Sequence, residues 1–236
     1  MDRYPLQGRE SEMFRLGAAW GGAVGGRPAL VLLRGEPGTG RSRLAAETAD
    51  LATRTGGTVH IAPPVPDESP VLVVLDDAEP ATVDALSLGT RMLVVATVRP
   101  EDGDRITKPA TRIDVRPLPP AALTRLAEAA GHPDAAEALR ARTGGLALFA
   151  VEALHDLAAG AAGVPESFGA LVADRVHRLG EPAARLLRAA AVDGTPNAAT
   201  LGPVGPAAVA ARLLVPAPGG YAFAHELIRD ALAGTD

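Results

Sequence analysis

The chain has 236 residues, 47% of them hydrophobic, which is enough to bury one large core or two smaller ones. Its formal net charge of -5 offers no positive face for phosphate backbones or anionic membranes, which argues against DNA binding by this chain alone. The sequence contains no cysteine and no apolar run near the ~18 residues of a membrane span, so we expect a cytoplasmic protein with no disulfide, thiolate metal site or membrane segment.

A glycine-rich turn is the first strong signal along the chain. Residues 29–34 (ALVLLR) are typical of a strand buried on both faces, and residues 43–54 have a helical mix of alanine, leucine and charge. Between them, GEPGTGRS has the spacing of a phosphate-binding loop, in which backbone N–H groups converge on phosphate oxygens. A glycine-rich turn without a ligand, with Ser42 only capping the helix, is the alternative. The predicted nucleotide-binding residues of this loop are Gly35, Pro37, Gly38, Thr39, Gly40, Arg41, Ser42 and Arg43, and Ser42 is also a predicted Mg²⁺ ligand.

Arg41 stands where phosphate-binding loops normally have a lysine. Its guanidinium keeps the positive charge, but it is planar and wide and cannot occupy the space of a compact ammonium. Lys108 is the only lysine of the chain, so drift toward arginine is a neutral explanation. We expect nucleotide binding to survive and hydrolysis to be slow or absent.

Two aspartates follow the next strong apolar run. A weaker strand is expected at 58–62 and a proline-rich connector at 62–70, before the run at 71–75 (VLVVL) that ends in Asp76 and Asp77. In this arrangement one carboxylate holds Mg²⁺ and the next orients or polarises the attacking water. We therefore predict Asp76 as a metal ligand and both aspartates as catalytic residues.

The sheet is expected to continue with strands at 92–98 (MLVVATV) and 111–115. Arg99 follows the first of these strands and is a third predicted catalytic residue, because its side chain could reach a γ-phosphate; a solvated arginine is the alternative. From residue 120 to 159 the chain predicts three short helices, broken near 131–133 and 143–145.

The C-terminal third predicts a small helical unit with a hairpin. Apolar residues recur at helical spacing over 171–190, which indicates two amphipathic helices. The end, RLLVPAPGGYAFAHELIRDAL, predicts a strand, a glycine turn, a second strand and a helix. The expected fold class is α/β, with a parallel-sheet nucleotide-binding core at 1–117, a helical lid at 118–163 and a winged-helix-like domain at 164–236.

Nearly the whole chain resembles the STAND class of P-loop NTPases, relatives of AAA+ proteins. The matching motifs are LQGRE (6–10), GEPGTGRS, VLVVLDD, VVATVRPED, RTGGLALF and YAFAHELIRDAL, and the resemblance is strongest to the ATPase module of large ATP-binding LuxR-type bacterial transcriptional regulators. The resemblance implies binding of ATP or ADP with Mg²⁺, with Gly8 and Arg9 near the adenine and Arg99 as a phosphate sensor. It also implies that His225 touches the ADP phosphate in a closed state, and a purely structural histidine is the alternative.

Several departures from the family pattern leave the function open between three readings. Arg41 replaces the usual lysine, Ala147 replaces the proline of the lid signature, and the aromatic residue that usually follows Asp77 is missing. The leading expectation is an ADP-held switch module of a regulator, acting through a protein partner or self-association. An active ATPase that drives remodelling and a nucleotide-independent scaffold are the alternatives, and a small-molecule kinase is disfavoured because no substrate-binding insertion is visible.

Overall fold

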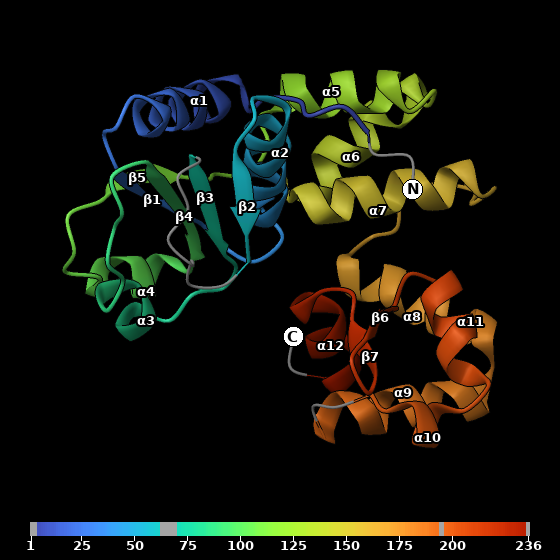
Figure 1. Cartoon of the computed structure of the whole chain (residues 1–236). Helices are drawn as coiled ribbons and strands as arrows, with labels where there is room; N and C mark the ends of the chain where they lie inside the picture. The colour runs from blue at the N-terminus through green and yellow to red at the C-terminus, as the bar shows by residue number, and fades with distance from the viewer. Residues whose placement is uncertain (1–3, 62–69, 194–195, 235–236) are drawn as a thin grey trace. The chain divides into compact units, whose positions relative to one another are not determined.

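The computed structural model describes residues 4–61, 70–193 and 196–234 (Figure 1). The chain forms two compact units, one of residues 1–126 with 145–148 and the other of residues 127–144 with 149–236. The proline-rich connector expected at 62–70 lies, except for its last residue, outside the described residues. The three-part division expected from the sequence stays a prediction.

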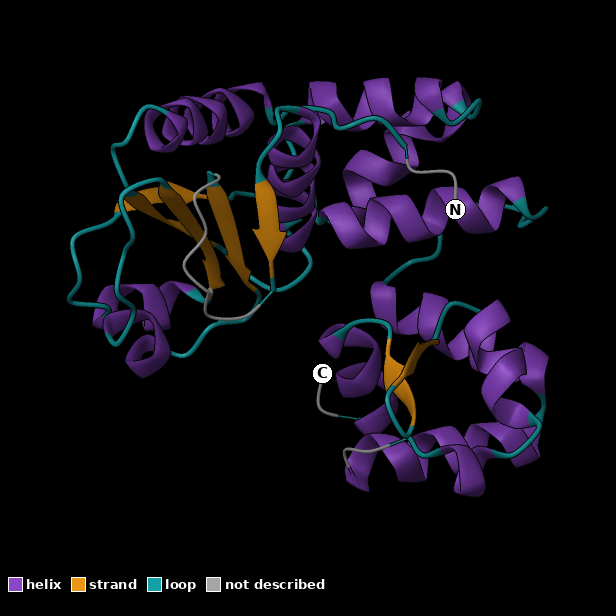
Figure 2. Ribbon diagram, viewed as in Figure 1, coloured by secondary structure: helices purple, strands orange, loops and turns teal. Residues whose placement is uncertain are grey.

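A five-stranded parallel sheet is the centre of the first unit, with the strand order β2-β3-β4-β1-β5 (Figures 1 and 2). The strands predicted at 29–34, 71–75 and 92–98 are confirmed, whereas those expected at 58–62 and 111–115 end earlier. The strands are β1 Ala29–Arg34, β2 Thr58–His60, β3 Val71–Leu75, β4 Met92–Val98 and β5 Thr111–Asp114.

Helices cover both faces of this sheet, which explains why the strands are apolar along their whole length. On β1, Val31 and Leu33 are fully buried in the core shared with α1 and α2, and Leu30 and Leu32 are buried in the core on the opposite face. Period-two alternation therefore divides one apolar run between two cores. The four helices are α1 Glu10–Val24 and α2 Arg41–Arg54 on one face, with α3 Pro80–Asp84 and α4 Pro100–Arg105 on the other.

The second unit is mostly helical. Its hairpin of β6 and β7 is antiparallel, as the glycine turn predicts, and α12 packs against α8 and α9. None of the helices in the described part of the chain is both long enough and apolar enough to cross a membrane. The elements after β5 are α5 Pro120–Ala129, a 3₁₀ turn Pro133–Ala135, α6 Ala136–Thr143, α7 Ala147–Ala158, α8 Phe168–Leu179, α9 Glu181–Asp193, α10 Ala198–Leu201, α11 Val204–Ala210, β6 Leu214–Ala217, β7 Gly220–Phe223 and α12 Glu226–Ala233.

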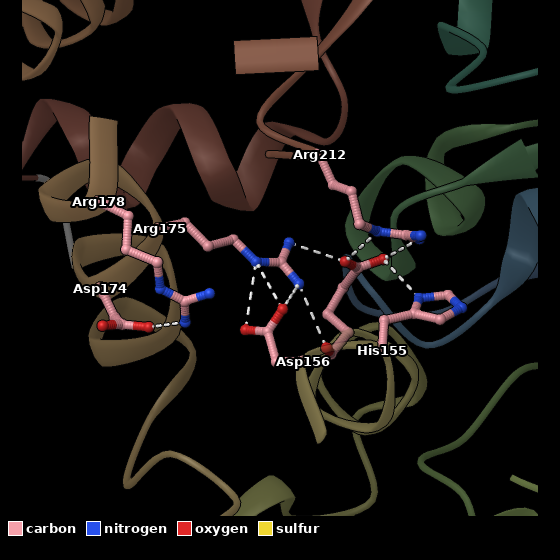
Figure 3. Close-up of polar contacts among 7 residues, drawn as sticks. His155, Asp156, Asp174, Arg175, Arg178 and Arg212 are labelled. Atoms are coloured by element: carbon pink, nitrogen blue, oxygen red, sulfur yellow. Dashed lines mark hydrogen bonds and ion pairs between the residues drawn. The ribbon is translucent and has the colours of Figure 1, made fainter. Parts of the chain in front are cut away.

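A buried ionic cluster joins α7 to α8 and to the turn before β6 (Figure 3). Arg175 of α8 is only 3% exposed, and its guanidinium donates to Glu152 Oε2 at 2.8 Å and to Asp156 Oδ1 at 2.8 Å. Arg212, in the left-handed region at φ 60, donates from Nε and Nη2 to the two carboxylate oxygens of Glu152 at 2.8 Å each. Two carboxylates thus face two guanidinium groups, and the cluster is neutral.

Burial and nearby charges shift the pKa of Glu152, the carboxylate at the centre of this cluster, in opposite directions. Burial alone would raise the pKa of Glu152, but the hydrogen bond from Arg212 and the charges of Arg175 and Arg212 outweigh it and hold the pKa below its ordinary range. For the neighbouring His155, burial and the charge of Arg212 lower the pKa, so the neutral imidazole is favoured. The surroundings therefore favour an ionised Glu152 carboxylate beside a neutral His155 imidazole.

Candidate functional site

The turn between β1 and α2 has the backbone geometry of an anion cradle. Gly38 and Gly40 have φ values of 78 and 100, a region that residues with a side chain rarely adopt. Gly40 is the N-cap of α2, and no side chain among the described residues caps that end of the helix. The first N–H groups of this 14-residue helix and its positive dipole end are therefore directed at the turn, where they favour a negatively charged ligand.

Thr39 and Gly35 set the shape of this turn. The Thr39 side chain is 1% exposed, and its Oγ1 donates to the Glu36 carbonyl at 2.7 Å. Gly35 leaves β1 so close to β5 that an added Cβ would lie 2.4 Å from the Val115 carbonyl oxygen. Only glycine fits there without movement of the backbone, and the start of the loop is therefore anchored to the sheet.

Asp76 connects the loop helix to two strands of the sheet. Ser42 Oγ, on the first turn of α2, donates to Asp76 Oδ1 at 2.8 Å, and Thr97 Oγ1, near the end of β4, donates to the same oxygen at 2.6 Å. The Thr97 hydroxyl also accepts from the Asp77 backbone N–H at 2.8 Å. The structure thus brings together Ser42, Asp76 and Asp77, which the sequence nominated as site residues. Thr97, which links them, was not nominated.

Thr97 is the site residue that the sequence analysis missed. It is 1% exposed and is the one polar side chain in an apolar strand. β3 and β4 pair in parallel with Leu75 opposite Ala96, so the next position on each strand places Thr97 beside Asp76. A lone polar residue near the carboxyl end of a buried strand was the available signal, but its register against β3 could not be read from the sequence.

The donor set around Asp76 fits Mg²⁺. The serine hydroxyl and the aspartate carboxylate are hard oxygen ligands, and Mg²⁺ in nucleotide sites takes only one or two protein ligands and completes its shell with waters and phosphate oxygens. Within residues 4–61, 70–193 and 196–234, no group of three or more His, Asp or Glu side chains is placed to hold a metal alone. Ser42 and Asp76 would hold the ion, which would supply positive charge beside a bound phosphate.

The three arginines predicted to serve the phosphates have different surroundings. Arg41, the first residue of α2, is 7% exposed. Arg43 donates from Nε to Glu47 at 2.8 Å and from Nη2 to the Tyr4 carbonyl at 3.4 Å, so its guanidinium is held by Glu47 and the N-terminal segment. Arg99 is half-buried and is the N-cap residue of α4. The roles assigned to them, like those of Pro37, Asp76 and Asp77, stay predictions.

Gly8 and Arg9, predicted to lie near adenine, contact the loop and the start of α5. Gly8 has φ 64, and an added Cβ would lie 2.6 Å from Ala122 Cβ. Arg9 is 4% exposed, and its Nη2 donates to the backbone carbonyls of Thr39 and Arg116 at 2.8 and 2.6 Å. The N-terminal motif is therefore fixed against the glycine loop by hydrogen bonds.

The lid signature also meets the glycine loop. The Leu148 N–H donates to the Gly38 carbonyl at 2.9 Å, and the Leu118 N–H donates to the Gly145 carbonyl at 2.7 Å. Ala147 stands where the resembling family has proline, and its Cβ lies 3.7 Å from the position of a Cβ on Gly40. The start of α7 is thus tied to the loop through backbone atoms.

His225 belongs to the second unit, where it is the N-cap residue of α12. Its Nδ1 accepts a hydrogen bond from the Leu227 N–H at 3.1 Å. An imidazole that accepts at Nδ1 carries its proton on Nε2 when it is neutral. The predicted contact between His225 and a nucleotide phosphate stays a prediction.

Comparisons with known proteins settle the fold. A Signal Transduction ATPase with Numerous Domains (STAND) protein from Pyrococcus horikoshii, which has a tetratricopeptide repeat sensor, is 14% identical with a TM-score of 0.60 over 100% of this chain. The chain has the fold of a P-loop NTPase. It spans less than half of that STAND protein, 43% of its length, and at this identity the likeness shows the fold alone.

Two further solved structures of P-loop proteins match with lower scores. The RuvB Holliday junction branch migration motor of Thermotoga maritima is 16% identical over 92% of both chains, with a TM-score of 0.47. The Walker-type ATPase of Pyrococcus abyssi is 14% identical over 96% of both chains, with a TM-score of 0.43. No protein-family model and no curated protein matches the sequence.

Proposed function

We propose that this chain is an adenine-nucleotide-binding switch module of a signalling or transcriptional regulator, of the STAND type found in LuxR-type proteins, with weak or absent hydrolysis. ATP or ADP with Mg²⁺ is the proposed ligand, and a protein partner or a second copy of the chain is the proposed target of the switch. The observation that carries the proposal is the pair of hydrogen bonds that Ser42 and Thr97 donate to Asp76 beside the uncapped end of α2.

Two kinds of group that nucleotide binding needs support the proposal. The N–H groups at the start of α2 supply donors for phosphate oxygens, and the Ser42 hydroxyl and the Asp76 carboxylate supply oxygen ligands for the metal that accompanies them. Ser42 is exposed and belongs both to the helix start and to the donor set. A glycine turn with no ligand requires no carboxylate at this position, so the coincidence supports nucleotide binding over the ligand-free reading.

ADP and ATP with Mg²⁺ are expected to bind the purified chain and to raise its stability, because a ligand that binds only the folded state stabilises it by mass action. At about ten times the dissociation constant the gain is roughly 1.4 kcal/mol. Isothermal calorimetry and thermal unfolding, each with and without Mg²⁺, measure this. Replacing Ser42 by alanine is expected to remove most of the Mg²⁺ dependence.

Ser87→Ala is the matched control, because it deletes an exposed hydroxyl of the same unit far in sequence from the loop. It should leave nucleotide binding and its Mg²⁺ dependence unchanged. If millimolar nucleotide gives no binding heat and no thermal shift, the proposal is wrong, and the nucleotide-independent scaffold is favoured.

The switch requires that the two nucleotides differ in their contacts with the second unit. A ligand can shift a conformational equilibrium only by its difference in affinity for the two states. We propose that the C-terminal segment, as a winged-helix-like domain, closes over ADP with His225 Nε2 donating to a phosphate oxygen. The hydrogen bond that His225 Nδ1 accepts from Leu227 supports this, because it leaves the proton of the neutral ring on Nε2.

Substitution of His225 by alanine and by asparagine separates the proposed phosphate contact from helix capping. Asparagine is a good N-cap residue and keeps an acceptor for the Leu227 N–H, whereas alanine does not. Both variants lose the imidazole, so both should weaken ADP about tenfold relative to ATP, which corresponds to ~1.4 kcal/mol. Competition binding with the two nucleotides measures the ratio.

Stability distinguishes the two roles of the histidine. Only His225→Ala should lower the free energy of unfolding, by about 1 kcal/mol, because only this variant lacks the cap. If His225 serves as a cap alone, the ADP to ATP affinity ratio of both variants will equal that of the unaltered chain, and the proposed closed state will be wrong.

A further inference from the structure

Arg9 is a buried cation whose hydrogen bonds go to the protein itself. Its Nη2 lies 2.8 Å from the Thr39 carbonyl oxygen and 2.6 Å from the Arg116 carbonyl oxygen, and its Nη1 lies 3.1 Å from Glu12 Oε1. The residue is 4% exposed. Its guanidinium therefore bridges the glycine loop, the chain that leaves β5, and the first turn of α1.

The bond to Thr39 acts on the next peptide unit of the loop. A peptide group is planar and trans, so the Thr39 carbonyl and the Gly40 N–H lie in one plane and point in opposite directions. A donor that holds the carbonyl therefore determines where the Gly40 N–H points. A charged donor also polarises the peptide group, which makes that N–H a stronger donor to an anion.

Gly40 is the residue whose orientation most needs this support. Its φ of 100 lies outside the regions that ordinary residues hold by their own steric preference, and glycine crosses between regions at little cost. Among the described residues no side chain caps α2 at this position. The Gly40 peptide therefore depends on neighbours such as Arg9 for its direction.

The segment that carries Arg9 is itself fixed in place. The tight approach of Gly8 to Ala122 leaves no space for a side chain, and Arg9 is the N-cap residue of α1. The guanidinium thus reaches Thr39 from the start of α1, thirty residues earlier in the chain.

We propose that Arg9 is a positioning residue for the phosphate-binding loop, which it serves by holding the Thr39–Gly40 peptide with its N–H toward the phosphates. The proposal rests on the proposed nucleotide binding. It differs from a direct contact between Arg9 and the adenine base, because the part of the ligand that benefits is the phosphate chain.

Comparison of ADP with inorganic pyrophosphate, which has no base, tests this role. Arg9→Met is expected to weaken the binding of both by the same factor of about ten, measured by displacement of a fluorescent ADP analogue. Arg9→Lys keeps the charge but has no planar fork for two carbonyls, so it should weaken both ligands by an equal but smaller factor. The amide resonance of Gly40 should shift in both variants without any ligand.

Two control variants separate positioning from stability. Arg125→Met removes an exposed arginine that bonds Gln7 and Glu10 of the same N-terminal segment but does not touch the loop, and it should change neither affinity. Ile113→Val removes a buried methyl group from β5, and it should lower the melting temperature without weakening either ligand.

Each remaining outcome contradicts one of the two proposals. If the Arg9 variants lose ADP affinity but keep pyrophosphate affinity, Arg9 contacts the base. If they keep both affinities, Arg9 is a structural residue. Either result overturns the positioning role while nucleotide binding stands. An unaltered chain that binds neither ligand would overturn the proposed function, and the positioning role with it.

Discussion

Replacing Arg175 by methionine should destabilise the second unit by about 3 to 5 kcal/mol, the cost of leaving a buried charge without its partner. Asp156 forms its ion pair with Arg175 and would lose it, whereas Glu152 would keep its ion pair with Arg212. Methionine fills a similar volume, so the loss reports the charge more than a cavity. Urea unfolding followed by circular dichroism measures the change.

A matched control lies one turn further along the same helix. Arg178 pairs with Asp174, and both side chains are about half exposed, so Arg178→Met should cost no more than about 1 kcal/mol. Both substitutions remove an arginine from α8, so helix propensity cancels in the comparison. Equal losses for the two variants would contradict the importance of the buried cluster.

A double variant tests whether the cluster acts through charge balance. Arg175→Met together with Asp156→Leu removes one buried pair and leaves Glu152 with Arg212, so the cluster stays neutral. Replacing a buried ion pair by apolar residues is often close to neutral. The double variant should therefore be more stable than Arg175→Met alone. If the losses simply add, packing and not charge would explain the single variant.

The ionic cluster shows why part of this fold could not be predicted from the sequence. Arg175 lies within the apolar stripe of α8, beside the buried Leu171, Val172 and Val176, and the sequence analysis assigned it no role. Its partners lie 19 and 23 residues earlier on α7, and Arg212 lies 60 residues after Glu152. Charge pattern alone cannot select partners across such distances.

The strands of the sheet were easier to predict from the sequence than the helices, because of their local composition. Strands buried on both faces need continuous apolar runs, and β1, β3 and β4 therefore appear at their observed bounds. α1 was not predicted, because its glycines at 17, 21 and 22 weaken the helical signal although Leu16 and Trp20 are buried. The short helices α3 and α4, each begun by a proline, were also missed.

In the candidate site, too, local patterns could be predicted from the sequence and long-range contacts could not. The glycine spacing and the paired aspartates are local patterns, and the structure brings Ser42 and Asp76 together as those patterns require. The bond of Thr97 to Asp76 and the bonds of Arg9 to the carbonyls of Thr39 and Arg116 depend instead on register and on contacts between segments 21 to 107 residues apart. Local motifs therefore nominated the candidate site residues, whose roles stay predictions, but not Thr97 or the bonds that Thr97 and Arg9 make with them.

Arg41→Lys is expected to raise ATP hydrolysis by roughly 100-fold, the lower end of the effect of one well-placed donor on developing charge. Ser42, Asp76 and Asp77 are already present, and Asp76 is oriented by two hydroxyl groups. Arg41 is 7% exposed, and we expect a compact ammonium to fit between the β- and γ-phosphates where its wide guanidinium does not. Phosphate release under steady-state conditions measures the change.

Two further variants test whether the expected rise in ATP hydrolysis depends on the candidate site and on position 41. Arg54→Lys makes the same exchange at the exposed far end of α2 and should leave the rate unchanged. Adding Asp77→Asn to Arg41→Lys should abolish the gain, because the aspartate is the proposed partner of the attacking water. An unaltered chain that already hydrolyses ATP at ~1 to 100 per second, as phosphoryl-transfer enzymes such as kinases do, would contradict the argument from Arg41. It would make the chain a motor that tolerates arginine, because the guanidinium would then stabilise the transferring phosphate as well as an ammonium does.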